Sequence, residues 1–334
     1  MENIPKFSSD EKKQLLQAVK DAYERLNVEQ KQVIEQKHLQ QAYTAEQWLD
    51  YLQEIAEYDY HVDNYLRVFP KKYGDNSGCL WALSIGTIIF GIWLLMISEG
   101  DFRSWIYIAI FLSSVPFWVW HYIYEAKTQK TVTQKRNMPN FLRNFIVPLV
   151  AVLKEETRPQ TPIQLNINMR DPAKTKQKDE LKKDTKGNGT FYIYDMLNLR
   201  TRLSDGTVLW LKVQDVIRER FKYKRKGNKY KIKVKRVYQL QMSLPKKHYT
   251  LKTSAIKPSF RLKKEDKPTK YGFKVKLAQS FYQTTTTYKG NQGEEYWKYG
   301  MEVSERKIPN LNSILDLIAT VYKQVDPIEA TTQP

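Results

Sequence analysis

Nine of the ten basic residues between positions 218 and 235 carry the clearest chemical signal in this sequence. They alternate mostly with apolar, aromatic or acidic residues, so two β-strands would place all nine on one face. Clustered Lys and Arg side chains bind carboxylate and phosphate groups through charge-assisted hydrogen bonds. The predicted anion-binding residues are Arg218, Arg220, Lys222, Lys224, Lys226, Lys229, Lys231, Lys233 and Lys235.

The pair Gly227-Asn228 is typical of a two-residue hairpin turn between these strands. Such a turn would set Lys226 opposite Lys229 and would leave an apolar opposite face suited to packing on a core. On that opposite face, Glu219 would lie across from Arg236 and form one ion pair. The apolar residues of the same face would be Phe221, Tyr223, Ile232 and Val234.

Two interpretations of the basic face are open. Lys is common on exposed sheet edges because it prevents strand-to-strand aggregation, so the face could be a solvated edge. Alternatively it binds an anionic partner, and the partners we expect are negatively charged lipid head groups or an acidic protein. A nucleic acid is less favoured, because a platform for single strands needs aromatic and basic residues on the same face.

Patterns typical of catalysis or cofactor binding are absent from the sequence. It contains no Gly-rich nucleotide-binding loop, no nucleophile elbow and no paired-cysteine motif. A single cysteine excludes an intrachain disulfide, and the histidines are far apart in sequence. We therefore expect no catalytic, cofactor or metal site and a non-enzymatic role, with an enzyme of unrecognised type as the alternative. The four histidines are His38, His61, His121 and His248.

The positive charge is concentrated in the C-terminal part of the chain. The 334 residues carry a net charge of +19, but residues 1–75 contain 10 Lys/Arg and 14 Asp/Glu. Residues 127–334 contain 44 Lys/Arg and 19 Asp/Glu, so the basic character belongs to this region. A region of that length can bury its own hydrophobic core.

Two uncharged apolar runs, residues 79–98 and 104–124, have the length that a helix needs to cross a bilayer. Only residues 99–103 separate them, so the sequence predicts an antiparallel transmembrane hairpin. Neither run has an ionisable residue at mid-depth, which indicates an anchor rather than a transport path. A pore built by oligomerisation is the less favoured alternative.

Basic residues flank the predicted hairpin on both outer sides, with Arg67, Lys71 and Lys72 before it and Lys127 and Lys130 after it. By the positive-inside rule, both termini would be cytoplasmic and the short loop would lie outside. The expected location is the plasma membrane or a bacterial inner membrane, with the lipid bilayer itself as a partner.

The N-terminal segment, residues 1–72, predicts a cytoplasmic pair of helices. Ser8-x-x-Glu11 and Thr44-x-x-Gln47 have the spacing of capping boxes, and each precedes an amphipathic stretch. Gln30 interrupts the apolar repeat of the first helix, and Asp59 interrupts that of the second. The pair could pack on itself or mediate homo-oligomer contacts.

The chain after the hairpin predicts a connecting helix and then a basic α+β domain. Residues 139–156 are apolar enough for an amphipathic helix, which Pro148 would break or bend. Ser204-Asp205-Gly206 is a turn signal, residues 313–325 predict a closing amphipathic helix, and residues 326–334 are expected to be disordered. The predicted strands are Phe191 to Leu197, Val208 to Val213, Phe221 to Lys226, Lys229 to Leu240, Phe273 to Leu277 and Phe281 to Tyr288.

These features predict an α+β membrane protein with an N-terminal helical pair, a two-helix transmembrane hairpin and a C-terminal antiparallel-sheet domain closed by a helix. Its four parts would be residues 1–72, 73–126, 127–158 and 159–334. The expected function is that of a membrane-anchored cytoplasmic binding or scaffold protein, whose basic domain contacts anionic lipid or an acidic protein. The alternative is a membrane effector whose C-terminal domain senses nucleic acid and whose hairpin acts on the membrane.

Overall fold

The computed structural model of the protein forms two compact units, which are described separately. The first unit comprises Met1–Ala22 and Tyr60–Asn137, and the second comprises Tyr23–Asp59 and Met138–Pro334. The predicted four-part division of the chain stays a prediction. The residues that the structure describes are 9–68, 136–170, 182–183, 189–222, 228–252, 261–288 and 308–328.

Two helices, α1 (Ser9–Arg25) and α3 (Ala45–Val68), contribute nearly all the described residues of the first unit, and each continues into the second. Within the first unit, α1 buries Val19 and Ala22, while α3 buries Val62. The Gln17 side chain donates a hydrogen bond to Asp21 one turn later, at 2.7 Å, which supports the exposed face of α1.

The second unit is built on one large antiparallel sheet with the strand order β1-β2-β4-β5-β6-β9-β8, and β3 pairs with β4. A separate two-stranded sheet joins β7 to β10. Its other helical elements are α2 (Val28–Gln36), the π-helical turn η1 (Leu142–Ile146), α6 (Val147–Glu156) and α7 (Leu311–Tyr322). Its strands are β1 (His38–Tyr43), β2 (Ile163–Asn168), β3 (Lys182–Lys183), β4 (Gly189–Arg202), β5 (Val208–Lys222), β6 (Asn228–Pro245), β7 (Tyr249–Leu251), β8 (Arg261–Asp266), β9 (Lys270–Tyr288) and β10 (Val325–Pro327).

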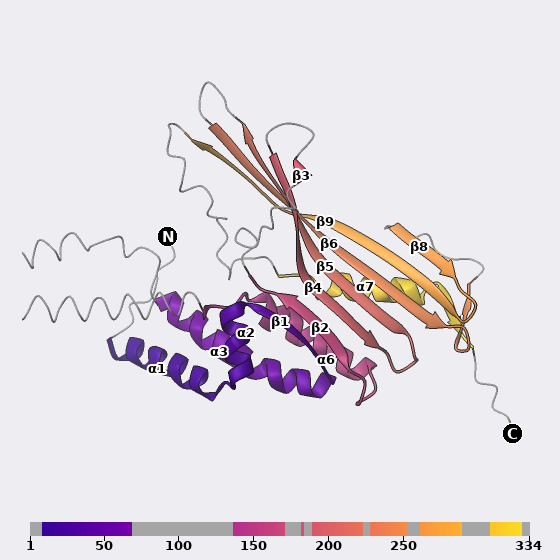
Figure 1. Ribbon diagram of the computed structural model, residues 1–334, viewed down its shortest axis with the longest axis horizontal. Coiled ribbons are helices and arrows are strands. Elements are labelled where there is room, and N and C mark those ends of the chain that lie inside the picture. The colour runs from indigo at the N-terminus through magenta and orange to yellow at the C-terminus, as the bar shows by residue number, and fades with distance from the viewer. Residues whose placement is uncertain are drawn as a thin grey trace, which may run out of the picture. The chain divides into compact units, whose positions relative to one another are not determined.

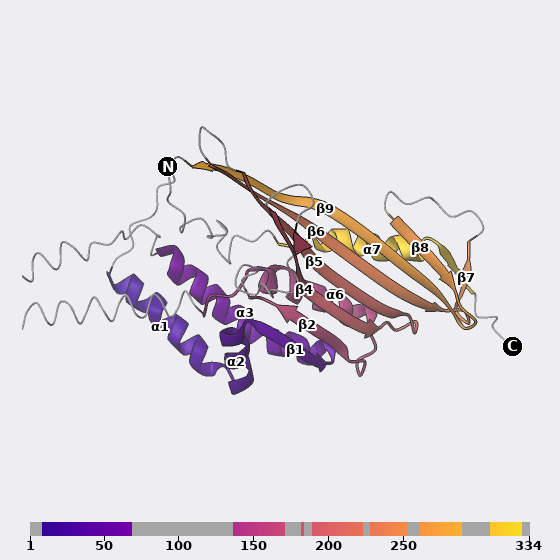
Figure 2. The same cartoon turned by 45° about the horizontal axis from the view of Figure 1, so that its top comes forward.

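The two faces of the large sheet differ sharply in burial. One face is covered by α6 and α7, which lie on the same side of the sheet in both ribbon views (Figure 1 and Figure 2). Side chains alternate across a strand, so the next residues along each strand point to the opposite, open face. A cross-strand row of the covered face consists of Leu199, Leu211, Leu240 and Val275, all at most 2% exposed.

A buried ion pair extends the covered face beyond this apolar row. Asp215 and Arg236 are direct cross-strand partners, with Arg236 Nε 2.7 Å from Oδ1 and Nη2 2.8 Å from Oδ2. Arg236 is fully buried and Asp215 is 7% exposed. This bidentate geometry compensates two charges that water cannot reach. The predicted partner of Arg236 was Glu219, and the structure instead places Glu219 opposite Ile232.

The predicted membrane architecture is overturned by the structure. Within the described ranges, no helix is both long and apolar enough to cross a membrane. The helix α3 has 24 residues, but charged side chains occur in every one of its turns. The predicted spans, residues 79–98 and 104–124, lie outside the described residues. The integral-membrane location and the cytoplasmic orientation of both termini depended on these spans and are withdrawn.

The predicted N-terminal helical pair is wrong, because a break after Arg25 divides its first helix into α1 and α2, and the strand β1 separates α2 from α3. Asn27 begins α2 with its own capping box, in which Asn27 Oδ1 accepts from Gln30 N at 2.8 Å and Gln30 Oε1 accepts from Asn27 N at 2.9 Å. Gln30 therefore interrupts the apolar repeat because it caps a helix. Lys37 ends α2 in the left-handed region, at φ 52°, and β1 follows directly.

The second predicted capping box is confirmed. Gln47 N donates to Thr44 Oγ1 at 3.3 Å, and Thr44 N donates to Gln47 Oε1 at 3.0 Å at the start of α3. Asp59, which interrupts the apolar repeat of this helix, is fully buried and accepts a hydrogen bond from Met138 N. Its other oxygen lies 3.3 Å from Arg143 Nη1, so this carboxylate ties α3 to the segment that leads into α6. The first predicted box begins at Ser8, outside the described residues.

The helix predicted over residues 139–156 is confirmed as η1 followed by α6, and it continues through Pro148. Pro148 is the second residue of α6 and follows directly on the π-helical turn η1. The closing helix is confirmed as α7, with Ile314, Leu317 and Val321 fully buried. Val325–Pro327 forms β10, so the start of the expected disordered tail is instead paired with β7.

The turn predicted at residues 204–206 is confirmed, and it anchors the C-terminal elements. Asp205 Oδ2 accepts hydrogen bonds from the hydroxyls of Tyr249, at 2.6 Å, and Tyr322, at 2.8 Å, while Thr207 N donates to Oδ1. Gly206 supplies the positive φ, 85°, that this turn needs. One carboxylate thus links the β4–β5 turn to both β7 and α7.

Protonation of Asp205 is expected to loosen this link. Burial alone would raise the pKa of Asp205, but the hydrogen bonds from Tyr249, Thr207 and Tyr322 outweigh it and lower the pKa below its ordinary value of 3.8. The contribution to stability is therefore fully present above 3.8 and is lost as the pH falls through the lower pKa of the folded state. Between about pH 7 and about pH 3, the urea midpoint should fall further in the wild type than in Asp205→Asn, whose amide does not titrate. Equal slopes in the two proteins would contradict this role.

Candidate anion-binding face

The predicted basic hairpin exists, but its register is wrong by four residues. The structure sets Lys222 opposite Lys229 and Arg218 opposite Lys233, whereas the predicted turn would have set Lys222 opposite Lys233. A shift by an even number of residues keeps every side chain on its face. The basic residues of the two strands therefore still share one face of the sheet.

This shared face is the open face of the sheet. Lys233 and Lys235 are exposed, and Arg218, Arg220 and Lys231 are half-buried. The positions of Lys222 and Lys229 belong to the same face by their register. Two predicted residues, Lys224 and Lys226, lie outside the described residues.

Further basic residues on neighbouring strands enlarge this surface well beyond the hairpin. Arg200 lies opposite Trp210, which lies opposite Gln241, then Lys274, then Lys263. The adjacent row runs from Asn198 through Lys212, Gln239 and Lys276 to Arg261. We call the whole surface the open basic face, and its basic residues with described side chains are Arg200, Arg202, Lys212, Arg218, Arg220, Lys231, Lys233, Lys235, Arg261, Lys263, Lys274 and Lys276.

The acidic residues on the described part of this face are both already paired. Asp195 lies 2.8 Å from Lys212 Nζ and also accepts a hydrogen bond from Gln214. Glu265 lies 2.6 Å from Lys274 Nζ and 3.4 Å from Lys267 Nζ. The hydrogen bond from Lys274, followed by that from Lys267, lowers the pKa of Glu265. The face consequently keeps a large surplus of positive charge at neutral pH.

An apolar strip lies on the open basic face, in two adjacent rows that also contain Lys235, Gln214 and Asp195. Ile193 lies opposite Val216, and Val237 lies opposite Ala278 on β9. Ile193 is 43% exposed although it is large and hydrophobic. Beyond the strip on one side are Arg218 and Lys233, and on the other side is the row that contains Lys212 and Lys276. An apolar strip with a charged rim is typical of surfaces that bind other proteins.

Two aromatic residues also lie on this face, although none was predicted there. Phe191 lies opposite Arg218, and Trp210 lies on the same strand as Arg218. Trp210 is eight residues before Arg218 along β5, so the rings of Phe191 and Trp210 are about 27 Å apart. Isolated rings at that spacing do not form the continuous stacking path that single-stranded nucleic acid uses.

No family model, no curated protein and no solved structure matches this chain. Within the described ranges, His, Cys, Asp and Glu residues form no group of three or more that could hold a metal ion. The expected partners, including self-association through the N-terminal helices, stay predictions, and the function has to be inferred from the chemistry of the surface itself.

Proposed function

We propose that this protein is a non-enzymatic binding protein that holds an acidic segment of a partner protein on its open basic face. The observation that carries the proposal is the surplus of positive charge, because the basic residues of β4, β5, β6, β9 and β8 on this face outnumber its two acidic residues, Asp195 and Glu265, and both of these already lie in ion pairs. Like charges on one sheet face destabilise it, so an anionic partner would relieve a real energetic cost.

The apolar strip supports a protein as the partner. Ile193 and Ala278, which are exposed, and the half-buried Val216 offer aliphatic surface that leucine or isoleucine side chains between acidic residues could cover. The amides of Gln239 and Gln241 lie within the two basic rows, beside Lys276 and Lys274, and amide groups can bond to a peptide backbone. Phosphate groups of a nucleic acid or a lipid surface would use the charge but not this strip.

The test uses three exposed lysines of the face in the full-length protein. Lys233→Gln, Lys235→Gln and Lys276→Gln are combined in one variant, and the control combines Lys20→Gln, Lys247→Gln and Lys323→Gln, which are exposed elsewhere. The probe is a fluorescent peptide of Asp and Glu with interspersed Leu, titrated at two salt concentrations. We expect the face variant to bind about tenfold more weakly or worse, and the control to stay within about twofold of the wild type.

Parallel arms compare the peptide with other anions. A single-stranded oligonucleotide of equal charge and vesicles of phosphatidylcholine with phosphatidylserine are titrated under the same salt conditions. Tighter binding of either one than of the peptide would overturn the proposal in favour of that partner. A peptide in which Leu is replaced by Ser should bind more weakly, because it cannot cover the apolar strip. Equal losses in the face variant and the control would show that net charge alone drives binding.

A further inference from the structure

The large sheet ends in two edge strands, β8 and β1, which differ in charge. Five of the six residues of β8 are charged, and charged side chains on an edge strand hinder pairing with a further strand. The six residues of β1 include neither a charged residue nor a proline. Three consecutive residues of β1, Gln40, Gln41 and Ala42, are exposed. The edge at β1 therefore lacks the features that protect the edge at β8.

Backbone groups of β1 point outward from this edge. In an antiparallel pair, positions bonded to the partner strand alternate with positions whose N–H and C=O point away from it. Lys37 O accepts a hydrogen bond from Met169 N at 2.8 Å, in the register of β1 with β2, so the bonded positions of β1 are odd-numbered. The N–H and C=O groups of His38, Gln40 and Ala42 consequently point away from β2. Within the described part of the chain, these outward groups have no hydrogen-bond partner.

Side-chain contacts on the open face of the sheet hold β1 against β2. Asn166 Nδ2 donates to Gln40 Oε1 at 3.3 Å, and Asn166 Oδ1 lies 3.2 Å from His38 Nε2. These contacts keep the backbone of β1 extended without using its outward groups. An edge that is already ordered lowers the entropic cost of adding a strand.

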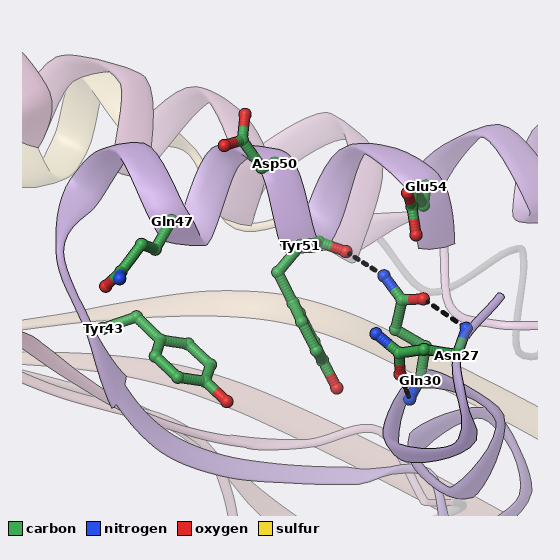
Figure 3. Close-up of a pocket in the computed structure, with 7 residues that line it drawn as sticks. All are labelled: Asn27, Gln30, Tyr43, Gln47, Asp50, Tyr51 and Glu54. Carbon is green, nitrogen blue, oxygen red and sulfur yellow. Dashed lines mark hydrogen bonds between the residues drawn. The ribbon is translucent and has the colours of Figure 1, made fainter.

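A pocket of about 350 Å³ lies beside the end of β1, on the covered face of the sheet (Figure 3). Tyr43 of β1 and Tyr51 of α3 line it with ring centroids 5.8 Å apart, and the start of α2 contributes the remaining side. Gln41 points to the same face, opposite the buried Leu165, and is nevertheless exposed. The helices thus leave the covered face open at this part of the edge.

A strand added to β1 would direct side chains toward this pocket. Side chains alternate across a strand, so every second residue of the added strand would point to the covered face, level with Gln41 or Tyr43. The pocket has room for one large side chain, and the two phenol rings favour an aromatic or aliphatic one. In this mode of recognition, backbone hydrogen bonds give affinity and the pocket selects the side chain.

The charges beside β1 favour a basic partner over a second copy of this chain. α2 ends just before β1 and α3 begins just after it, so both helices lie next to this edge. Pairing two copies through β1 would bring these helices close to their own copies, and their acidic residues would repel one another. Lys or Arg residues of a partner would instead be attracted. The charged residues of α2 and of residues 45–56 in α3 are Glu29, Lys31, Glu35, Glu46, Asp50 and Glu54.

We propose that β1 binds an extended segment of a partner protein as an added strand of the large sheet. The segment carries one bulky apolar side chain, which enters the pocket beside Tyr43 and Tyr51, and Lys or Arg residues on either side of it. This interaction goes beyond the proposed function, because it uses a sheet edge and a basic segment rather than the open basic face and an acidic one.

The test titrates the full-length protein with a fluorescent peptide of about ten residues, in which Val and Thr alternate around a central Phe and both ends carry Lys. Gln40→Pro removes an outward N–H that β1 does not use with β2, and proline is tolerated on the outer side of an edge strand. We expect this variant to bind about tenfold more weakly or worse. The matched control Gln40→Thr keeps the N–H and should bind within about twofold of the wild type. Urea unfolding checks that both variants keep their fold.

Two isomeric peptides test the same hydrogen bonds without any change in the protein. Each is N-methylated at alternate residues, and the isomers differ in which edge of the peptide loses its donors. One isomer should keep its affinity and the other should lose it, because only one edge pairs with β1. Equal binding of the two isomers would overturn the proposal, and this result decides the matter even where Gln40→Pro is unfolded.

Further outcomes separate the pocket, a second copy and the open basic face. Replacing the central Phe of the peptide by Ala should weaken binding about tenfold, and unchanged binding would contradict the role of the pocket. A wild-type dimer that is lost in a folded Gln40→Pro protein would show that a second copy occupies the edge, which overturns the proposal. The Lys233→Gln, Lys235→Gln, Lys276→Gln variant should bind this basic peptide as the wild type does, so failure of either proposal is seen separately.

Discussion

Asp215→Ala is expected to lower the free energy of unfolding by about 3–5 kcal/mol, one of the two largest effects in this protein. Arg236 is fully buried, and the substitution would leave its guanidinium without the carboxylate that lies 2.7 Å from Nε and 2.8 Å from Nη2. A buried charge without its partner cannot recover its hydration. Urea unfolding, followed by circular dichroism, measures the change in midpoint.

The reciprocal variants separate the cost of the lone charge from the value of the pair. Arg236→Met alone leaves the buried carboxylate of Asp215, which is 7% exposed, without Arg236, and the double variant Asp215→Leu with Arg236→Met removes both charges. We expect the double variant to be markedly more stable than Asp215→Ala, because hydrophobic replacement of a buried pair is often nearly neutral. An Asp215→Ala protein within about 1 kcal/mol of the wild type would contradict the burial of this pair.

Trp48→Ala is expected to cost about 3–5 kcal/mol of unfolding free energy. Trp48 is fully buried, and its indole Nε1 donates a 2.7 Å hydrogen bond to the carbonyl oxygen of Ile163, at the start of β2. Removing the ring would leave a cavity between α3 and the sheet and would also leave that carbonyl oxygen without its donor. Thermal and urea unfolding of the full-length protein check the loss.

Trp48→Phe divides this effect into its two parts. Phenylalanine keeps most of the buried ring and loses the indole donor, so its cost should be about 1–3 kcal/mol. The matched control is Tyr60→Ala on the same helix, where the side chain is 54% exposed and truncation should cost little. A Trp48→Ala variant that is no less stable than Tyr60→Ala would show that α3 does not pack on β2 through this residue.

The sequence was informative wherever a local pattern determines structure. The π-to-α helix over residues 142–156, the amphipathic helix around Leu317 and the turn at Asp205 each have the signal in the residues themselves. The placement of basic residues on one face of β5 and β6 and apolar residues on the other was also predictable. Basic residues recur at every second position of each strand, and side chains alternate between the two faces of a sheet.

The features that were missed depend on distant parts of the chain. The strand β1 has six residues between two helices, and it pairs with β2, which is more than 100 residues further along. Nothing local in His38–Tyr43 indicates that partner. The register of β5 with β6 was wrong because a plausible two-residue signal, Gly227-Asn228, outweighed the pairing set by the rest of both long strands.

The extent of the candidate site could not be predicted for a similar reason. Arg200, Lys212, Lys274 and Lys276 give no sign of a common site when each strand is considered alone. Only the strand order brings them into rows with the predicted lysines. The apolar strip is likewise made by Ile193 and residues of other strands, so neither its position nor its basic rim could be inferred from one segment.

The pairing of β1 with β2 limits how this protein can be divided for experiments. A fragment that starts at residue 138 would lose β1 and Trp48 together, although it keeps most of the large sheet. The N–H and C=O groups of β2 that pair with β1 would then lie unpaired at the edge of the sheet. The core beside β2 would also lack the side chains that α3 contributes, such as Trp48. Such an edge recruits the same edge of another copy. Dimers or precipitates of that fragment would therefore report the cut itself, and they would say nothing about how the intact chain associates.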